Sequence, residues 1–477
     1  MLRRSQMPFS VAVLISVALL LRVARWLTLV DCGVGGVDDT FSPRAPLPPF
    51  PVHERARELR RDTLSPVDVV YVTAFPRHAA SSLRSLCYFA DVGAVGTVHL
   101  IVPDRMADFF KSDAVLAALQ CPRASAWKGA QAPTLRFAVW AESTLVRAFA
   151  PGGASWSGTT RQMTLKLAAA RFVTSPFYLV MDSDVYARQR FSRADLFDAS
   201  GTRARADVDQ NDFCQPATWY NQASRVLASR LVADTNAYCA HLAAAAGYSA
   251  VAPNDCPPAD TGLTYAPSWF ASTLNASVPA NPFALILDEA ADGGSHQVFG
   301  ACRAARSHAS HVTPMILARA IVLDVLAPRL ESLDAARTGS PEKRAPKREW
   351  LDVLLDFHAE RAATCRQGSS GRFYSWTEYA LYFVAGVASH AMGQYHSFSE
   401  RGITSIEHSM MKPVNYERAN WAAIFNDNAD KRPFFIVHSW FGKPIEETDA
   451  HMAPFVPTLA FGALDNFPPM PSPAPLW

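Results

Sequence analysis

Short apolar runs alternate along the first half of the chain with longer segments in which apolar residues recur at helical spacing. Strand-like runs occupy Val67–Thr73, Thr97–Val102 and Leu135–Trp140. Helical patterns lie between them, at Ala80–Phe89 and Arg105–Leu119. Such alternation is typical of βαβ units and of a largely parallel sheet. The pattern therefore predicts an α/β fold with a doubly wound sheet.

A fourth apolar run, residues 177–181, leads directly into the carboxylate pair Asp182-Ser183-Asp184. The helical segment before it can begin with a capping box formed by Thr159 and Gln162. In open α/β sheets, ligands bind at the carboxyl ends of the strands. Two carboxylates there suit Mg²⁺ or Mn²⁺ bound together with phosphate oxygens. Asp and Ser are also common after strands as turn and cap residues, so the pair alone does not decide the function.

Three segments resemble GT-A-fold glycosyltransferases, which use nucleotide-diphospho-sugars. Residues 162–191, with Lys166 in the helix and Asp182 and Asp184 after the strand, resemble the D-x-D region of these enzymes. Residues 67–75 resemble their first strand, which lies beside the nucleotide. Residues 434–444 resemble their C-terminal metal and phosphate motif, with His438 and Lys443. The spacing departs from the usual pattern, with three residues between His438 and Gly442 and none between Gly442 and Lys443.

This resemblance implies a GT-A-like, Rossmann-like mixed sheet and a metal-dependent transfer of sugar to a glycan or glycoconjugate acceptor. The implied metal ligands, for Mn²⁺ or Mg²⁺, are Asp182, Asp184 and His438. The residues implied in donor binding are Asp182, Lys166, Lys443 and Thr73. Glu378, which follows the aromatic Trp376, is the candidate for acceptor contact or general base, and Asp182 is the second catalytic candidate.

Other functions remain open. A glycoside hydrolase is disfavoured, because its two carboxylates face each other across the scissile bond, whereas Asp182 and Asp184 follow one strand end. A phosphotransferase with the same metal–diphosphate geometry is one alternative, and a catalytically inactive, lectin-like scaffold is another. The net charge of +2 and the lack of a basic stripe with interleaved aromatic residues argue against nucleic-acid binding.

The N-terminus reads as a targeting segment. Arg3 and Arg4 precede an uncharged run from Pro8 to Leu21, which has the length of a signal-peptide h-region. We favour an uncleaved signal anchor that places a luminal catalytic domain in the Golgi or endoplasmic reticulum, as a single-pass type II membrane protein. A cleaved signal peptide, which gives a secreted protein, and an organellar transit peptide are the alternatives.

Pro-rich stretches suggest the domain boundaries. We predict a membrane or signal segment at 1–30, a Pro-rich stem at 31–66, a catalytic domain at 67–452 and a Pro-rich tail at 453–477. The eight cysteines include no C-x-x-C pair, which argues against a zinc site. Both disulfides and buried thiols are compatible with them. Asn275 begins the one N-glycosylation sequon noted, as expected for a glycoprotein.

Overall fold

The computed structural model describes part of the 477-residue chain. Described are residues 65–120, 135–153, 156–206, 223, 226–227, 314–338, 348–364, 376–389, 391–397, 402–405, 408–410, 413–438 and 443–459. The predicted N-terminal segment, the stem, Asn275 and most of the predicted tail lie outside these residues.

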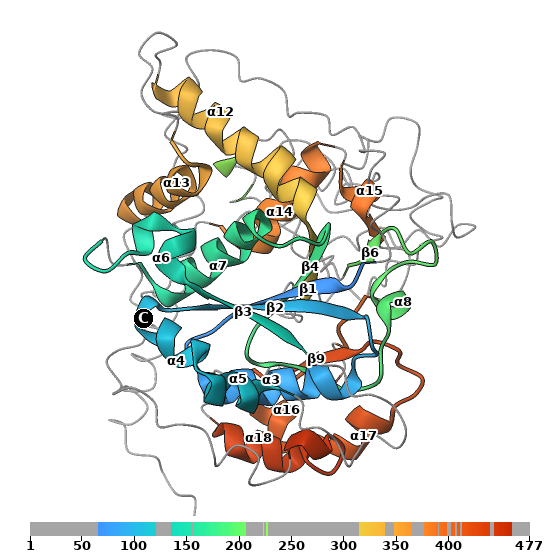
Figure 1. Ribbon diagram of the computed structural model, residues 1–477. Helices are drawn as coiled ribbons and strands as arrows, with labels where there is room; N and C mark the ends of the chain where they lie inside the picture. The colour runs from blue at the N-terminus through green and yellow to red at the C-terminus, as the bar shows by residue number, and fades with distance from the viewer. Residues whose placement is uncertain are drawn as a thin grey trace, which may run out of the picture.

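The central sheet has five strands in the order β3-β2-β1-β4-β7 (Figure 1). Their bounds are β1 Val67–Val72, β2 Val95–Val102, β3 Arg136–Ala141, β4 Phe177–Met181 and β7 Met315–Ala318. The first four are parallel to one another, and β7 pairs antiparallel with β4 at the edge. The strand order reverses between β1 and β4, which is where ligands bind in sheets of this kind. The fold is therefore mixed α/β with a mainly parallel sheet.

Helices cover both faces of the sheet (Figure 1). The α-helices are α3 Pro76–Phe89, α4 Ala107–Lys111, α5 Asp113–Leu119, α6 Glu142–Leu145, α7 Gly158–Ala168, α8 Arg193–Leu196, α12 Ala327–Thr338, α13 Trp350–Thr364, α14 Glu378–Ala388, α15 Met392–Tyr395, α16 Pro413–Glu417, α17 Trp421–Asn426 and α18 Ile445–Met452. Short 3₁₀ helices occupy Asp104–Met106, Arg147–Phe149, Ala169–Arg171 and Pro457–Leu459, and a π-helix occupies Ile321–Leu326. Helices α3, α5 and α18 lie on one side of the sheet, and α7, α12, α13 and α14 lie on the other.

Two small sheets extend the fold beyond β4. Strand β5 (Val185–Ala187) pairs antiparallel with β9 (Phe434–Ile436), and β6 (Ala204–Arg205) pairs parallel with β8 (His396–Ser397). The β5–β9 pair brings the C-terminal part of the chain back to the segment that follows β4.

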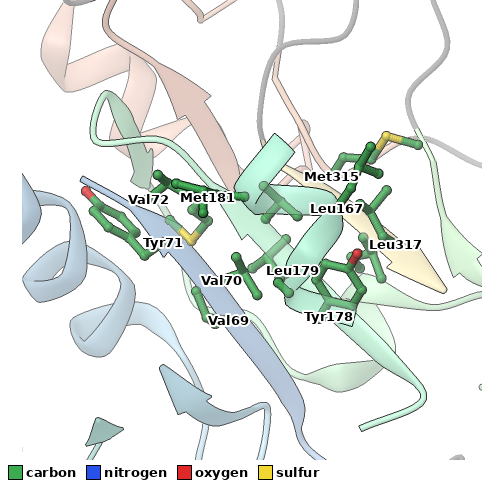
Figure 2. Packing of buried hydrophobic residues seen from close by; sticks show 14 of the residues in the cluster. Val69, Val70, Tyr71, Val72, Leu167, Tyr178, Leu179, Met181, Met315 and Leu317 are labelled. Atoms are coloured by element: carbon green, nitrogen blue, oxygen red, sulfur yellow. The ribbon is translucent and has the colours of Figure 1, made fainter. Parts of the chain in front are cut away.

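The central strands are apolar because both of their faces are covered. Every residue of β1 and of β4 is buried. Side chains of these two strands pack with Leu167 from α7 and with Met315 and Leu317 from β7 (Figure 2). Burial at roughly 25 cal/mol per Å² of apolar surface makes this layer the main source of stability, and it fixes where the carboxyl ends of β1 and β4 lie.

Two local predictions were wrong. The helix predicted at 105–119 is broken, because the Ser112 hydroxyl accepts from the Val115 amide and starts a new helix, α5. Helix α7 begins at Gly158, where the Ser157 hydroxyl accepts from the Thr160 amide at 3.1 Å. The capping box predicted from Thr159 is therefore replaced by a cap two residues earlier.

The prediction of a transmembrane, signal-anchored protein is corrected. Among the described residues, no helix is both long enough and apolar enough to cross a membrane. The apolar run near the N-terminus, from which we inferred the membrane character, lies outside the described residues. Cys87 on α3 is disulfide-bonded, whereas the other seven cysteines lie outside the described part.

Asp449 on α18 generates a prediction about pH. Burial raises its pKa from 3.8 to about 7, although it accepts a hydrogen bond from Ser81. The folded state therefore holds this proton more tightly than the unfolded chain, and the contribution to stability is lost as pH rises from about 4 through 7. Asp449→Asn should be more stable than the wild type at pH 8, by up to about 4 kcal/mol, and should be less sensitive to pH between 4 and 7. Urea unfolding at pH 5 and pH 8 measures both effects, and equal pH dependence in the two proteins would refute the assignment.

Candidate functional site

The loop Asp182-Ser183-Asp184 joins β4 to β5 at the carboxyl edge of the sheet. It lies at the reversal of strand order, beside the end of β1, because Tyr71 and Met181 are paired in the β1–β4 register. Asp182 keeps 24% of its side chain exposed, whereas Asp184 is 9% exposed as a whole residue. The two carboxylates therefore stand in different surroundings, although one residue separates them.

Asp182 is held by a buried lysine. The Lys166 ammonium, on α7, lies 2.9 Å from Asp182 Oδ1 and 3.1 Å from its Oδ2. The same nitrogen donates to Glu378 Oε1 at 2.8 Å. Lys166 and Glu378 are each 3% exposed. Side chains from three elements, α7, the end of β4 and the start of α14, therefore meet at one ammonium.

This arrangement keeps Lys166 charged. Burial alone lowers the pKa of an amine, but Asp182 and Glu378 outweigh it and hold the pKa of Lys166 well above its usual value. The ring of Tyr379 adds a cation–π contact, 5.4 Å from the nitrogen to the ring centre. Trp376, one turn before, is fully buried. Sequence reasoning predicted that Lys166 would contact the donor, and the structure places its ammonium between Asp182 and Glu378.

The C-terminal strand reaches the other side of the carboxylate loop. The Val437 amide donates to the Asp184 carbonyl at 2.9 Å, which continues the β5–β9 ladder. His438 is the next residue, and its own amide donates to the Met410 carbonyl. Burial lowers the pKa of His438, and the nearby negative charge of Asp182 opposes this shift. The imidazole is therefore favoured in its neutral form.

Thr73 lies at the end of β1, on the same edge of the sheet. Its hydroxyl accepts from the Phe75 amide at 3.0 Å, and the side chain is buried. The contact orders the turn that leads from β1 into α3. Thr73 thus orders the backbone that follows β1, the strand next to β4.

Lys443 has other described partners. Its ammonium lies 3.5 Å from Glu447 Oε1, on the first turn of α18, and 5.3 Å from the centre of the Tyr416 ring. Its side chain is one-third exposed. No described contact joins Lys443 to Asp182 or Asp184, so its role in donor binding stays a prediction.

Arg188, which sequence reasoning missed, fixes the approach to β9. It is fully buried, and its guanidinium donates to the backbone carbonyls of Ile424, Asp427, Asp430 and Arg432. These carbonyls belong to the segment directly before β9. An arginine directly after a short strand is not recognisable in sequence as such an anchor, because its partners lie more than 200 residues away.

One group of possible metal ligands lies in this same segment, formed by His408, Asp427 and Asp430. His408 Nε2 lies 3.0 Å from Asp427 Oδ2. Asp430, however, accepts from Arg432 and Ser405 and is paired with Arg188. Burial acts to raise the pKa of Asp430, but the hydrogen bonds from Arg432 and Ser405 outweigh it and hold the pKa far below the usual range. A carboxylate already compensated by two guanidinium groups is a poor cation ligand, and we interpret this group as structural.

The chain belongs to a protein family of unknown function, DUF6492, whose model matches residues 71–239 and 293–460, more than half of the chain. The match includes β4, the carboxylate loop, α14 and β9. No curated protein matches the sequence.

The buried lysine generates a prediction about stability. Lys166→Met leaves Glu378 and Asp182 without their cation, so the free energy of unfolding should fall by about 3–5 kcal/mol. The double variant Lys166→Met/Glu378→Gln should recover part of this loss. Lys443→Met, which removes a one-third-exposed lysine paired with Glu447, is the matched control and should cost less than about 1 kcal/mol. Equal stabilities of Lys166→Met and the control in urea unfolding would contradict the buried ion cluster.

Proposed function

We propose that this protein is a metal-dependent glycosyltransferase with a GT-A-like fold, which transfers a sugar from a nucleotide-diphospho-sugar to a glycan or glycoconjugate acceptor. The observation that carries the proposal is the convergence of the β4 carboxylate loop and the end of β9 at the reversal of strand order. Two segments that resemble separate motifs of such enzymes, about 250 residues apart, are therefore neighbours in space.

The residue types suit a divalent cation, although the compact group of possible ligand atoms found among the described residues is His408, Asp427 and Asp430. Asp184 and His438 offer a carboxylate and a neutral imidazole, and a nucleotide diphosphate would supply further oxygens. When bound, the cation would neutralise the charge that develops on the departing diphosphate. Both carboxylate oxygens of Asp182 face the Lys166 ammonium. Asp182 is therefore better suited to accept hydrogen bonds from ribose or sugar hydroxyls than to bind the metal through both oxygens.

Glu378 acts, in this proposal, through Lys166. Its side chain is 5% exposed, and its described contact is the ion pair with the Lys166 ammonium. A carboxylate in this setting is poorly placed to take a proton from an acceptor. We assign Glu378 the role of positioning Lys166, which in turn orients Asp182 beside the donor. The acceptor base is then left to other residues.

The proposal is tested by incubating the purified protein with nucleotide-diphospho-sugars, with and without Mg²⁺ or Mn²⁺, and by analysing the products. A glycosyltransferase should slowly hydrolyse its donor to free sugar and nucleoside diphosphate when the cation is present. Release of sugar phosphate would instead favour a phosphotransferase. Absence of any product and of nucleotide-induced stabilisation would favour the lectin-like scaffold.

Asp184→Asn should lower turnover by about 10²–10⁴-fold, because the amide keeps the shape but removes the negative charge that holds the cation. Thermal unfolding should change little. The matched control is Asp198→Asn, which alters another buried carboxylate, paired with Arg203. Asp198 adjoins Phe197, whose ring packs on Phe177 at the start of β4, away from the carboxylate loop. Near-normal turnover of Asp184→Asn would remove the site.

His438→Ala should raise the concentration of divalent cation needed for half-maximal activity by about 10–100-fold, since it removes a ligand without changing the donor contacts. Lys443→Ala should instead change the Michaelis constant for the donor, with little effect on the cation requirement. Titration of activity with Mn²⁺ separates the two effects. An unchanged cation requirement in His438→Ala would exclude the C-terminal strand from the metal site.

A further inference from the structure

The last turn of α3 carries the one cysteine that the structure describes. Cys87 is fully buried and forms a disulfide, and the other seven cysteines of the chain lie outside the described residues. A disulfide requires that the two Cα atoms lie within about 7 Å of each other. The partner therefore belongs to a segment that packs directly against the end of α3.

Helix α5 packs along α3 on the same face of the sheet (Figure 1). The Arg84 side chain joins the two helices, because its Nε and Nη2 atoms donate to the Ala118 carbonyl at 3.1 and 2.8 Å. Ala118 lies in the last turn of α5, where the carbonyl groups have no partner within the helix. Arg84 therefore satisfies one of them and fixes the end of α5 beside the second half of α3.

The two helices run in the same direction. Each lies on the connection between parallel neighbouring strands, α3 between β1 and β2 and α5 between β2 and β3, so each returns the chain to the amino edge of the sheet. Shortly after α3, the Ala94 carbonyl accepts from the Val67 amide at the start of β1. Directly after α5, the Gln120 side chain donates to the Leu135 carbonyl, just before β3, at 2.6 Å. The ends of both helices therefore lie at the amino edge.

The register between these parallel helices selects one cysteine. Three residues beyond the contact between Arg84 and Ala118, the sequence has Cys87 in α3 and Cys121 after α5. Cys121 directly follows Gln120, which is the last described residue of this segment. Consecutive Cα atoms are about 3.8 Å apart, so the position of Gln120 limits how far Cys121 can lie from the end of α5.

The other elements that pack on α3 lead to no nearby cysteine. They are β5, α18 and the 3₁₀ helix Pro457–Leu459. The nearest cysteine to any of them in sequence is Cys214, well after β5. Cys365 directly follows α13, which covers the opposite face of the sheet. Among these described neighbours of α3, only α5 leads directly to a cysteine.

We propose that the disulfide of Cys87 joins it to Cys121 and fastens the end of α5 to the last turn of α3. The two thiols lose two electrons and two protons as the S–S bond forms. The oxidant is a second disulfide, that of a thiol–disulfide oxidoreductase or of oxidised glutathione, which takes up both electrons and both protons and gives two thiols. Such oxidants maintain disulfides in oxidising compartments, where we therefore expect the chain to fold.

Helix α5 has little stability of its own. It has seven residues, whereas isolated helices shorter than about 12 residues are marginal in water. Its buried side chains are Val115 and Leu119. A bond that closes the loop from Cys87 to Cys121 removes conformations from the unfolded chain and so stabilises the folded one. The bond belongs to the amino edge, whereas the carboxylate loop lies at the carboxyl edge.

The test is peptide mapping of the intact chain, produced in an oxidising compartment and denatured in N-ethylmaleimide so that thiols cannot exchange. Trypsin without reductant should release fragment 85–105, which contains Cys87, covalently joined to fragment 112–123, which contains Cys121. Each fragment has a single cysteine, so the joined pair identifies the bond, and reduction should separate the two. Cys87 joined to any other cysteine, or recovered as a labelled thiol, would overturn the proposal.

Cysteine variants supply a second measurement. In Cys87→Ala, Cys121 should become a thiol that maleimide labels without reduction. Cys121→Ala should lower the melting temperature by about 5–10 °C. The double variant should melt within about 2 °C of Cys87→Ala, because both changes remove the same bond. The control Cys365→Ala should keep the joined fragments.

Two results with these variants would count against the pairing. One is a Cys121 that stays unlabelled in Cys87→Ala, and the other is a double variant whose loss equals the sum of the two single losses. If Cys87→Ala fails to fold, the peptide map of the wild type decides the assignment by itself.

Discussion

A lysine that is almost completely buried can stay charged only if carboxylates surround it, and this constraint organises the centre of the molecule. Lys166 meets Asp182 at the end of β4 and Glu378 at the start of α14. The isolated charges would cost several kcal/mol each to bury, so each partner depends on the other two. Because the three residues come from three elements, the ion cluster closes only when α7, β4 and α14 are all in place.

The same constraint sets the chemistry that is available at the sheet edge. Lys166 orients Asp182 and partly neutralises its charge. The backbone carbonyl of Asp184, two residues on, accepts a hydrogen bond from Val437, directly after β9. In the proposed function, Asp182 is therefore the hydrogen-bonding group, and Asp184 is the candidate metal ligand. The division depends on β9, and β9 depends on the Arg188 guanidinium, which gathers the carbonyls of the preceding segment. The proposed metal end of the site therefore rests on contacts between the Arg188 side chain and backbone carbonyls.

Much of this fold could be predicted from local patterns. Apolar runs located β1, β2, β3 and β4 to within two residues. Buried parallel strands and helices with one apolar face leave such patterns, because each residue's surroundings follow from its neighbours in sequence. The breaks were harder. Ser112 divides one predicted helix, and Ser157 rather than Thr159 caps α7, since several hydroxyl residues could serve as caps and only packing selects one.

The candidate site divides in the same way. Asp182 and Asp184 were recognisable because a strand delivers them, and His438 because a second strand-like run precedes it. The partners of Lys166, the anchoring role of Arg188 and the pairing of Arg161 with Glu142 were not recognisable, because each joins residues whose separation in sequence carries no period. The position of α7 explains why two of these three belong together. A helix laid across the carboxyl edge presents cations one and a half turns apart, and it reaches the end of β4 with Lys166 and the end of β3 with Arg161. A change in the packing of α7 should therefore alter the Lys166–Asp182 and the Arg161–Glu142 contacts at once.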